Sequence, residues 1–201
     1  DVRGYDVKQE GEHLTFKVAA GKLSVNVDLL LEGEHFVPDA LAAVTVALKL
    51  AVPSERISES LAAFRNMAGR QEILQVNGVT IIKDCYNAGP ESMAASLRVL
   101  GNRKTRRIAV LGEMLELGVS ATAEHYKVGR VAAESADLLF AYGPTSRKMV
   151  KGALTGGMPN ARAFAFEDRD KLVKKLKQSA RPGDVILFKG SRGMRMELIL
   201  D

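Results

Sequence analysis

Polar side chains that could bind a ligand follow an apolar β-branched run in the middle of the chain. The run at residues 80–83 leads directly to Asp84, Tyr86 and Asn87, and Pro90 then begins a helical pattern. Open α/β folds build ligand sites where a strand delivers polar side chains to the N-terminus of a helix. The segment therefore predicts a ligand site that combines a carboxylate, a phenol and an amide.

A second polar segment comes after the last apolar run of the sequence. Lys189, Ser191 and Arg192 follow residues 184–188, with Gly190 between the first two. Lysine and arginine side chains attract a carboxylate and can hydrogen-bond to it. The segment thus suits a carboxylate electrostatically, and the alternative is a basic loop on the protein surface.

Cys85 is the single cysteine of the chain, which excludes an internal disulfide and a cysteine-based zinc site. This usage fits the reducing cytoplasm. A nucleophilic role for Cys85 is not favoured, because no histidine lies near it in the sequence.

The composition of the chain disfavours several classes of function. The 201 residues suit one or two domains, and 46% hydrophobic with 26% charged residues is ordinary for a globular chain. The net charge of +5 comes from scattered basic residues, so a solvated surface is favoured over nucleic-acid binding, and a phosphate-rich small substrate would also explain the excess. There is no signal-peptide pattern, and no apolar run approaches the roughly 20 residues that span a bilayer.

The first third of the chain predicts a hairpin and two helices. Residues 12–30 alternate apolar and polar around Gly21, which is typical of a β-hairpin. Residues 38–51 have helical spacing, and Ser54 is placed to cap a second helix that runs to about Phe64. Gly21-Lys22 is not a phosphate-binding P-loop, since the other positions of that motif do not match.

The rest of the chain predicts a Rossmann-like α/β domain. Residues 73–84 form a hairpin pattern turned by Asn77-Gly78, and strands then alternate with helices. The expected helices are 90–100, 121–135, 146–153, 169–179 and one starting near Met194, and the expected strands are 107–111, 138–142, 161–165 and 184–188. This alternation indicates a mostly parallel, doubly wound sheet flanked by helices. We place a boundary near 65–70, with domains at 1–66 and 67–201.

Parallel strands bring their polar carboxyl ends to one edge of the sheet. Those ends carry 84–87, 112–114, 143–145 and 189–192. Glu113 and Glu116 are expected to be structural residues, which pair with basic neighbours or cap helices, rather than catalytic ones.

Five segments, in this order, resemble the motifs of the Mur ligases. They are Gly33 to Ala43, Gly69-Arg70, Asp84 to Met93, Val110 to Gly118 and Lys189 to Glu197. The last two resemble the branch of the family that adds D-alanyl-D-alanine. One match would be weak evidence, whereas five in order and spacing are specific and cover nearly the whole chain from about residue 12.

The resemblance implies a three-domain, ATP-dependent ligase of peptidoglycan precursor synthesis. In this family UDP-MurNAc-tripeptide and ATP give an acyl phosphate, and the amine of D-Ala-D-Ala attacks it to form an amide. Magnesium is implied because negative charge develops on the transferred phosphoryl group. The N-terminal and central domains are the expected partners, with residues 1–66 as the end of the central ATP-binding domain and 67–201 as the whole third domain.

The resemblance also implies roles for individual residues. Arg70 is matched to the γ-phosphate as a catalytic residue, and Asp84 to the nucleotide ribose, with Tyr86 and Asn87 shaping that site. Without the resemblance, a surface arginine in a linker is the favoured interpretation of Arg70. The alternatives for the other two are a helix N-cap for Asp84, which is compatible with the ribose contact, and a turn residue for Asn87.

The resemblance implies contacts for five further positions. His35 and Asp39 are matched to the segment beside adenine, although Asp39 stands where the family has asparagine and could instead cap a helix. Lys189, with a catalytic role, acts with Ser191 and Arg192 on the incoming dipeptide or the peptide carboxylate.

The ends of the sequence indicate a fragment, because it begins without Met and stops inside an apolar helical pattern. Without a P-loop we expect the fragment alone to be inactive. No metal ligands are assigned within it. The alternatives are another ligase of the superfamily, similar to folylpolyglutamate or cyanophycin synthetases, and a non-catalytic nucleotide-binding module.

Overall fold

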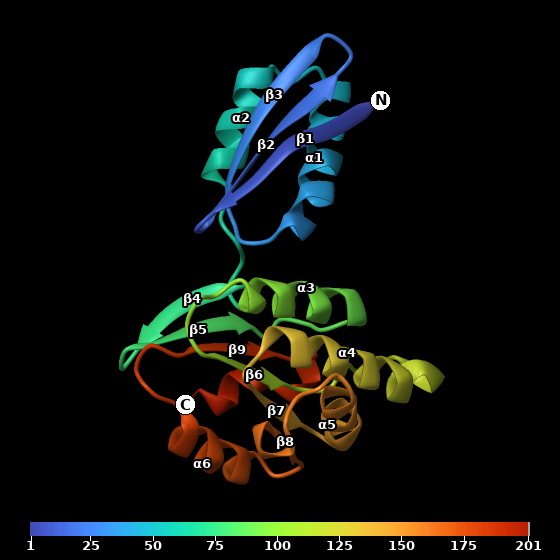
Figure 1. Cartoon of the computed structure of the whole chain (residues 1–201). Helices are drawn as coiled ribbons and strands as arrows, with labels where there is room; N and C mark the ends of the chain where they lie inside the picture. Colours follow the sequence, from blue (N-terminus) through green and yellow to red (C-terminus); the bar gives the residue numbers. More distant parts are fainter. Residues whose placement is uncertain (201) are drawn as a thin grey trace. The chain divides into compact units, whose positions relative to one another are not determined.

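The computed structural model describes residues 1–200 and divides the chain into two compact units (Figure 1). The first unit is Asp1–Asn66 and the second is Met67–Asp201. Each unit has its own sheet and its own hydrophobic core. Each unit therefore has the features of a structural domain.

A three-stranded antiparallel sheet and two helices form the first unit. Their bounds are β1 Val2–Glu10, β2 His13–Ala20, β3 Leu23–Leu30, α1 Val37–Lys49 and α2 Ser54–Ala63. Alternate residues of β2 and β3 are buried, and they form one core with Ala40, Val44 and Ile57 of the helices. This arrangement confirms the hairpin predicted from the period-two pattern.

The sequence did not predict β1. Its side chains are mostly exposed, and its register with β2 shifts between Tyr5 and Lys8, where Asp6 has a φ of 55°. A bulge of this kind interrupts the alternation from which a strand is recognised.

Neither of the two predicted helix caps in this unit forms. Ser54 is the first residue of α2, and its Oγ donates to Glu55 Oε1 at 3.1 Å rather than accepting from the backbone. Asp39 lies in the first turn of α1 and makes no capping hydrogen bond. Its charge is still favourably placed near the positive end of the helix dipole.

The second unit is built on a six-stranded sheet in the order β4-β5-β9-β6-β7-β8. The strands are β4 Glu72–Val76, β5 Val79–Asp84, β6 Arg107–Leu111, β7 Leu138–Tyr142, β8 Ala163–Phe166 and β9 Val185–Lys189. All neighbours pair in parallel except β4 with β5, which form the predicted hairpin. Asn77 and Gly78 have φ values of 49° and 78°, as a tight two-residue hairpin turn requires.

Helices cover both faces of this sheet (Figure 1). The helices are α3 Pro90–Gly101, α4 Ala121–Ser135, α5 Ser146–Thr155 and α6 Arg169–Ser179. The first core includes residues from α3, α4 and α5, and the second includes Leu172 and Leu176 of α6. The result is the mostly parallel, doubly wound α/β fold expected from the sequence.

The end of the chain departs from the prediction. The helix expected near Met194 is replaced by two short 3₁₀ turns, η4 Arg192–Met194 and η5 Met196–Ile199. Arg195 lies between them in the left-handed conformation, with a φ of 47°, and this prevents a continuous α-helix. Met196 and Ile199 are nevertheless buried in the second core.

Candidate functional site

The carboxyl ends of β5, β9 and β6 meet at one edge of the sheet. The backbone N–H of Gly112 donates to Lys189 O at 2.7 Å, and the N–H of Ser191 donates to Glu113 O at 2.9 Å. The chain after β5 and β6 leads to helices of the first core, whereas the chain after β9 leads to η5 in the second core. This divergence makes the edge a topological switch point, where open α/β sheets bind ligands.

A buried ion pair lies at the centre of this edge. Lys189 Nζ donates to Asp84 Oδ2 at 2.6 Å, and the side chains are only 3% and 11% exposed. Ser96 Oγ of α3 donates to the same carboxylate oxygen at 2.6 Å. Lys189 Nζ also donates to the carbonyl of Asn87 at 3.2 Å. The pair thus fastens β5, β9, α3 and the loop that follows β5.

The ion pair changes the interpretation of two predicted residues. Asp84 is not a helix cap, because the N-cap of α3 is Gly89, whose N–H donates to Ser92 Oγ at 3.0 Å. Lys189 is not part of an exposed basic loop, since it is enclosed against Asp84. Direct contact of Lys189 with a substrate stays a prediction.

Ser191 connects the loops around a cavity of about 360 Å³. Its Oγ accepts from the Leu115 N–H at 2.8 Å and donates to Ala88 O at 3.2 Å. The lining residues are Tyr86, Asn87, Ala88, Leu115, Glu116, Ser191, Arg192 and Gly193. Four residues predicted for the site therefore share one cavity, and the exposed Arg192 supplies its cation.

Arg70 stacks on Tyr86 at the start of the second unit. The guanidinium carbon lies 4.3 Å from the centroid of the ring, and both residues are exposed. The N–H of Tyr86 donates to Gly69 O at 3.0 Å, which holds the segment before β4 against the loop after β5. Among residues 1–200 Arg70 forms no ion pair, so its guanidinium is free to meet an anion.

The two residues predicted beside adenine belong to the first unit. His35 lies in the 3₁₀ turn η1, Glu34–Phe36, and its ring centroid is 4.2 Å from that of Phe36. Asp39 follows on α1, and both residues are exposed. Their predicted contact with adenine stays a prediction.

Three buried residues hold the edge in shape, and two of them, His125 and Ser96, were not singled out from the sequence. Glu113 Oε1 accepts a hydrogen bond from the Thr145 N–H, which joins the loops after β6 and β7 and fits the structural role expected for this residue. His125 Nε2 accepts from Met114 N–H at 2.9 Å, and its Nδ1 donates to Ala121 O at 2.6 Å. Ser96 contacts Asp84. A polar residue on the apolar face of a predicted helix was the available signal for His125 and Ser96.

Cys85 has the environment of a structural thiol. It is 3% exposed, and its Sγ donates to Phe188 O at 3.4 Å. Burial raises the pKa of the Cys85 thiol to about 12, and the nearby carboxylates of Glu197 and Asp84 add to the rise. A thiol with this pKa is a poor nucleophile near neutral pH.

The described residues fit a nucleotide phosphate better than they fit a metal ion. Within residues 1–200 no three His, Cys, Asp or Glu side chains are grouped to hold a metal. By contrast, the exposed guanidinium of Arg70 offers a planar fork to phosphate oxygens. No helix in the described part of the chain has the length and apolarity needed to cross a membrane.

Comparison with known proteins assigns the family. The family described as "Mur ligase, glutamate ligase domain" matches residues 69–192, which is most of the second unit. The chain belongs to the Mur ligase family. A curated member from Treponema pallidum, UDP-N-acetylmuramoyl-tripeptide--D-alanyl-D-alanine ligase, is 35% identical over 169 residues, which are 83% of this chain and 36% of that protein.

Solved structures of Mur ligases resemble both units. MurF from Acinetobacter baumannii matches with a TM-score of 0.89 and 30% identity, over 100% of this chain and 44% of that one. MurF from Thermotoga maritima in complex with ADP shares the fold, with a TM-score of 0.81 and 24% identity, over 100% of this chain and 45% of that one. This Mur ligase chain therefore spans less than half the length of these relatives.

Proposed function

We propose that this chain is part of an ATP-dependent ligase that adds D-Ala-D-Ala to UDP-MurNAc-tripeptide in peptidoglycan precursor synthesis. The observation that carries the proposal is the match of the whole chain, both units included, to MurF from Acinetobacter baumannii. The relative from Treponema pallidum is named for the same reaction. On this proposal residues 67–201 are the third domain of the enzyme.

The reaction has two steps with balanced charges and protons. The tripeptide carboxylate attacks the γ-phosphorus of ATP, ADP leaves, and an acyl phosphate forms. The amine of D-Ala-D-Ala then attacks the acyl carbon, phosphate leaves, and the nitrogen loses a proton to give the amide. Negative charge is concentrated on the transferred phosphoryl group, so nearby cations lower the barrier.

Arg70 is the residue of this chain that we assign to the γ-phosphate. Its guanidinium is exposed and has no carboxylate partner among residues 1–200, while Tyr86 supports it from one side at 4.3 Å. Stacking on an aromatic ring limits the motion of the guanidinium without occupying its N–H donors. Asp84, Tyr86 and Asn87 complete the proposed nucleotide contacts, with Asp84 near the ribose.

The cavity after β9 is the proposed place for a substrate carboxylate. Arg192 supplies an exposed cation there, and Ser191 fixes the loops that form the walls. Lys189 contributes beneath the cavity by neutralising Asp84 and holding the Asn87 carbonyl. A direct catalytic contact by Lys189 is part of the proposal and would use the ammonium N–H that Asp84 and Asn87 leave free.

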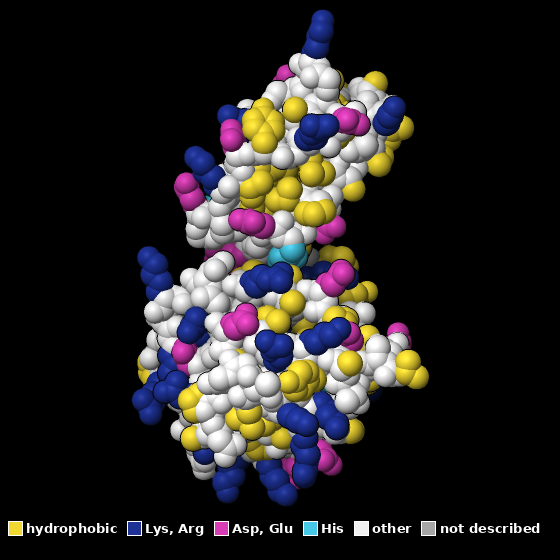
Figure 2. All heavy atoms as spheres, turned by 45° about the vertical axis from the view of Figure 1, so that its right-hand side comes forward, with side chains coloured by type: hydrophobic (Ala, Val, Ile, Leu, Met, Phe, Trp, Pro, Cys, Tyr) yellow, Lys and Arg dark blue, Asp and Glu magenta, His cyan; other side chains and the backbone are white. Residues whose placement is uncertain are grey.

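We assign the first unit to the end of the central ATP-binding domain, with His35 and Asp39 beside adenine. Figure 2 shows hydrophobic side chains gathered on one face of this unit, and its exposed apolar residues include Val46 at 59% and Leu50 at 73%. Surface of this kind is usual where a unit packs against further protein.

On this proposal, magnesium would be held by residues of the remaining domains, and the enzyme would act in the cytoplasm.

The test is a ligation assay on the full gene product that contains these 201 residues. We expect ADP release and amide formation with D-Ala-D-Ala and not with glutamate. Replacing Arg70 by Gln should lower kcat by about 10²–10³-fold, and Arg70→Lys should restore little, because the fork is lost. Arg65→Gln is the matched control, since Arg65 is exposed, lies five positions earlier in the sequence and bonds only to the carbonyls of Ala62 and Phe64 among residues 1–200.

Two results would contradict the proposal. A preference for glutamate would assign the protein to another branch of the superfamily. Unchanged turnover of the Arg70→Gln enzyme would remove Arg70 from the phosphate site. The 201-residue chain by itself is expected to give no amide, and clear ATP-dependent ligation by it would refute the assignment of the missing steps to other domains.

A further inference from the structure

A basic hollow lies at the edge of the second unit's sheet opposite to Asp84 and Lys189. Its volume is about 770 Å³, within the range of small-molecule sites. The lining residues are Arg103, Lys104, Thr105, Arg106, Arg107, Asp137, Leu138, Arg162 and Arg181. They come from the amino ends of β6 and β7 and from the segments that lead into β8 and β9. Since each strand is about five residues long, roughly 15 Å of sheet separates the two edges.

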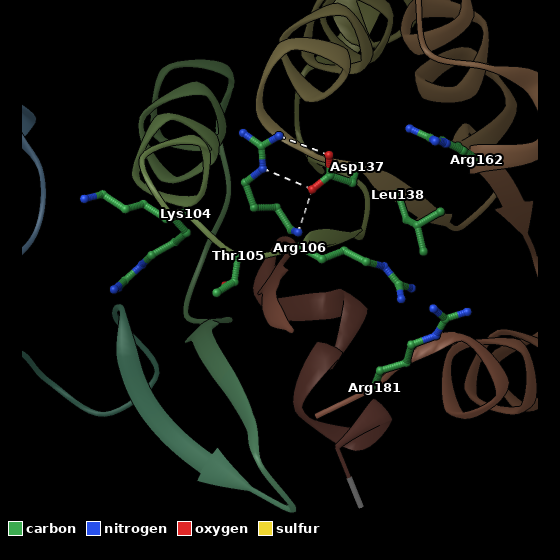
Figure 3. Close-up of a pocket in the computed structure, with 9 residues that line it drawn as sticks. Lys104, Thr105, Arg106, Asp137, Leu138, Arg162 and Arg181 are labelled. Carbon is green, nitrogen blue, oxygen red and sulfur yellow. Dashed lines mark hydrogen bonds and ion pairs between the residues drawn. The ribbon is translucent and has the colours of Figure 1, made fainter. Parts of the chain in front are cut away.

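The single acidic residue of the lining is already neutralised. Six of the nine lining residues are lysine or arginine, and Asp137 faces one of them. Arg107 Nη2 donates to Asp137 Oδ1 at 3.1 Å, and Arg107 Nε donates to Oδ2 at 3.2 Å (Figure 3). This side-chain contact holds the pKa of Asp137 below its usual value, so the carboxylate stays charged and paired with Arg107. Asp137 is the one carboxylate of the lining, and the charge of Arg162 also contributes to lowering its pKa.

Three arginines remain around the hollow with little or no neutralisation. Arg106 donates to Ser179 O at 2.7 Å, and its nearest carboxylate oxygen, on the buried Asp184, is 3.8 Å away. Arg162 and Arg181 are exposed and form no ion pair with any residue from 1 to 200.

The side chains of these arginines are arranged so that a negatively charged group could lie between them. Figure 3 shows the guanidinium groups of Arg106 and Arg181 pointing toward one another. Like charges repel, so this convergence raises the energy of the empty hollow, and an anion between the groups would lower it. Asp184 offsets part of the charge of Arg106, because its Oδ2 lies 3.8 Å from Arg106 Nη1 and also accepts the backbone N–H of Arg181 at 2.8 Å.

We propose that the hollow binds a small soluble anion that carries at least two phosphate groups. Planar guanidinium forks match phosphate oxygens, and arginines that come from separate segments can hold more than one group. Apart from Leu138 the lining offers no large apolar side chain, so recognition rests on charge and not on an extended apolar or aromatic body. The site is independent of the proposed ligase chemistry, whose residues lie at the carboxyl edge.

The experiment measures binding of inorganic pyrophosphate to the whole 201-residue chain by calorimetry at 0.15 M NaCl. We expect saturable binding at one site. The double variant Arg162→Gln/Arg181→Gln should weaken it about tenfold or more, because two charge-assisted contacts are lost. The matched control Lys174→Gln/Lys177→Gln removes the same charge from exposed positions of α6 outside the hollow and should bind as the original chain does. Arg70→Gln is measured beside them and reports any pyrophosphate that binds at the carboxyl edge instead.

Several outcomes would overturn the proposal. Absence of saturable binding would do so, and so would equal weakening in the arginine and lysine double variants, which would indicate diffuse attraction by net charge. Weakening by Arg70→Gln with no effect of the arginine pair would place pyrophosphate at the other edge. Binding to vesicles of phosphatidylcholine and phosphatidylglycerol without binding of pyrophosphate would show a membrane-facing surface instead. Thermal melting of each variant without ligand verifies that the fold is retained.

Discussion

The charged side chains at the two edges of the second unit's sheet lie in opposite environments. At the carboxyl edge Asp84 and Lys189 are buried and neutralise each other at 2.6 Å. At the amino edge five arginines and one lysine line an open hollow, and the lining offers them one carboxylate. The same sheet thus has a buried ion pair at the centre of one edge and a group of exposed cations around a hollow at the other.

The difference has a physical cause in solvation. A charge that is removed from water needs a partner, because the desolvation cost is several kcal/mol for each ion. An exposed arginine keeps its hydration and needs none. A buried ion pair is therefore evidence for a stabilising role in the fold. Exposed cations that converge on a hollow without ion pairs are instead evidence for an anion-binding surface.

The largest effect is expected at the buried pair. Replacing Asp84 by Asn leaves Lys189 enclosed without a counter-ion and should lower the free energy of unfolding by about 3–5 kcal/mol. Urea denaturation of the 201-residue chain measures this loss. In Asp84→Asn/Lys189→Met the unpaired charge is gone, so much of the stability should return, and the double-mutant cycle gives the coupling.

The matched control for this prediction is an exposed pair in the same unit. Lys127 and Glu124 approach to 2.7 Å on α4, and the lysine side chain is 67% exposed. Glu124→Gln should cost less than about 1 kcal/mol. A loss of similar size for Asp84→Asn would show that burial does not distinguish the two ion pairs.

Much of the fold could be predicted because local patterns determine it. The bounds of α4, β7 and α6 are those expected from the sequence, because the apolar residues of each element follow a regular helix or strand spacing. The Asn77-Gly78 turn was equally recognisable. By contrast, β1 was missed because its bulge and its exposed side chains remove the alternation of apolar and polar residues. The prediction of a final helix was wrong because Arg195 adopts a left-handed conformation.

The site could be predicted in part. The sequence indicated that the strand ends meet, but it could not indicate that Asp84 pairs with Lys189, because the two residues are 105 positions apart. The basic hollow was hidden for the same reason. The Arg106-Arg107 cluster was interpreted as solvated surface, and only the fold brings Arg162 and Arg181 to it.

An intermediate effect is expected at the one neutralised pair of the amino edge. Asp137→Asn removes the two side-chain contacts with Arg107, and because the Asp137 side chain is 34% exposed the loss should be about 1 kcal/mol or less at pH 7. Its folded pKa is lowered, so the carboxylate adds stability above the unfolded value of about 3.9 and loses this contribution as the pH falls through the folded pKa.

Urea denaturation at several pH values between 7 and 3 tests the sign of this effect. The stability difference between the original chain and Asp137→Asn should shrink as the solution is acidified. The exposed Glu134 provides the control variant Glu134→Gln, which should change little at either pH. A difference that grows toward acid pH would mean that Arg107 does not favour the ionised form of Asp137.

The smallest effect on stability is expected at the unpaired arginines. Arg162→Gln/Arg181→Gln removes repulsion across the hollow and should raise the free energy of unfolding by a few tenths of a kcal/mol at low salt, within the range of about 0.5 kcal/mol usual for surface changes. The gain should disappear in 1 M NaCl, where charges are screened beyond about 3 Å. Lys174→Gln/Lys177→Gln, on the exposed side of α6, should show a smaller salt dependence. If the arginine variant is instead destabilised by 2 kcal/mol or more, these side chains support the fold, and the contrast between the buried ion pair and the exposed arginines fails.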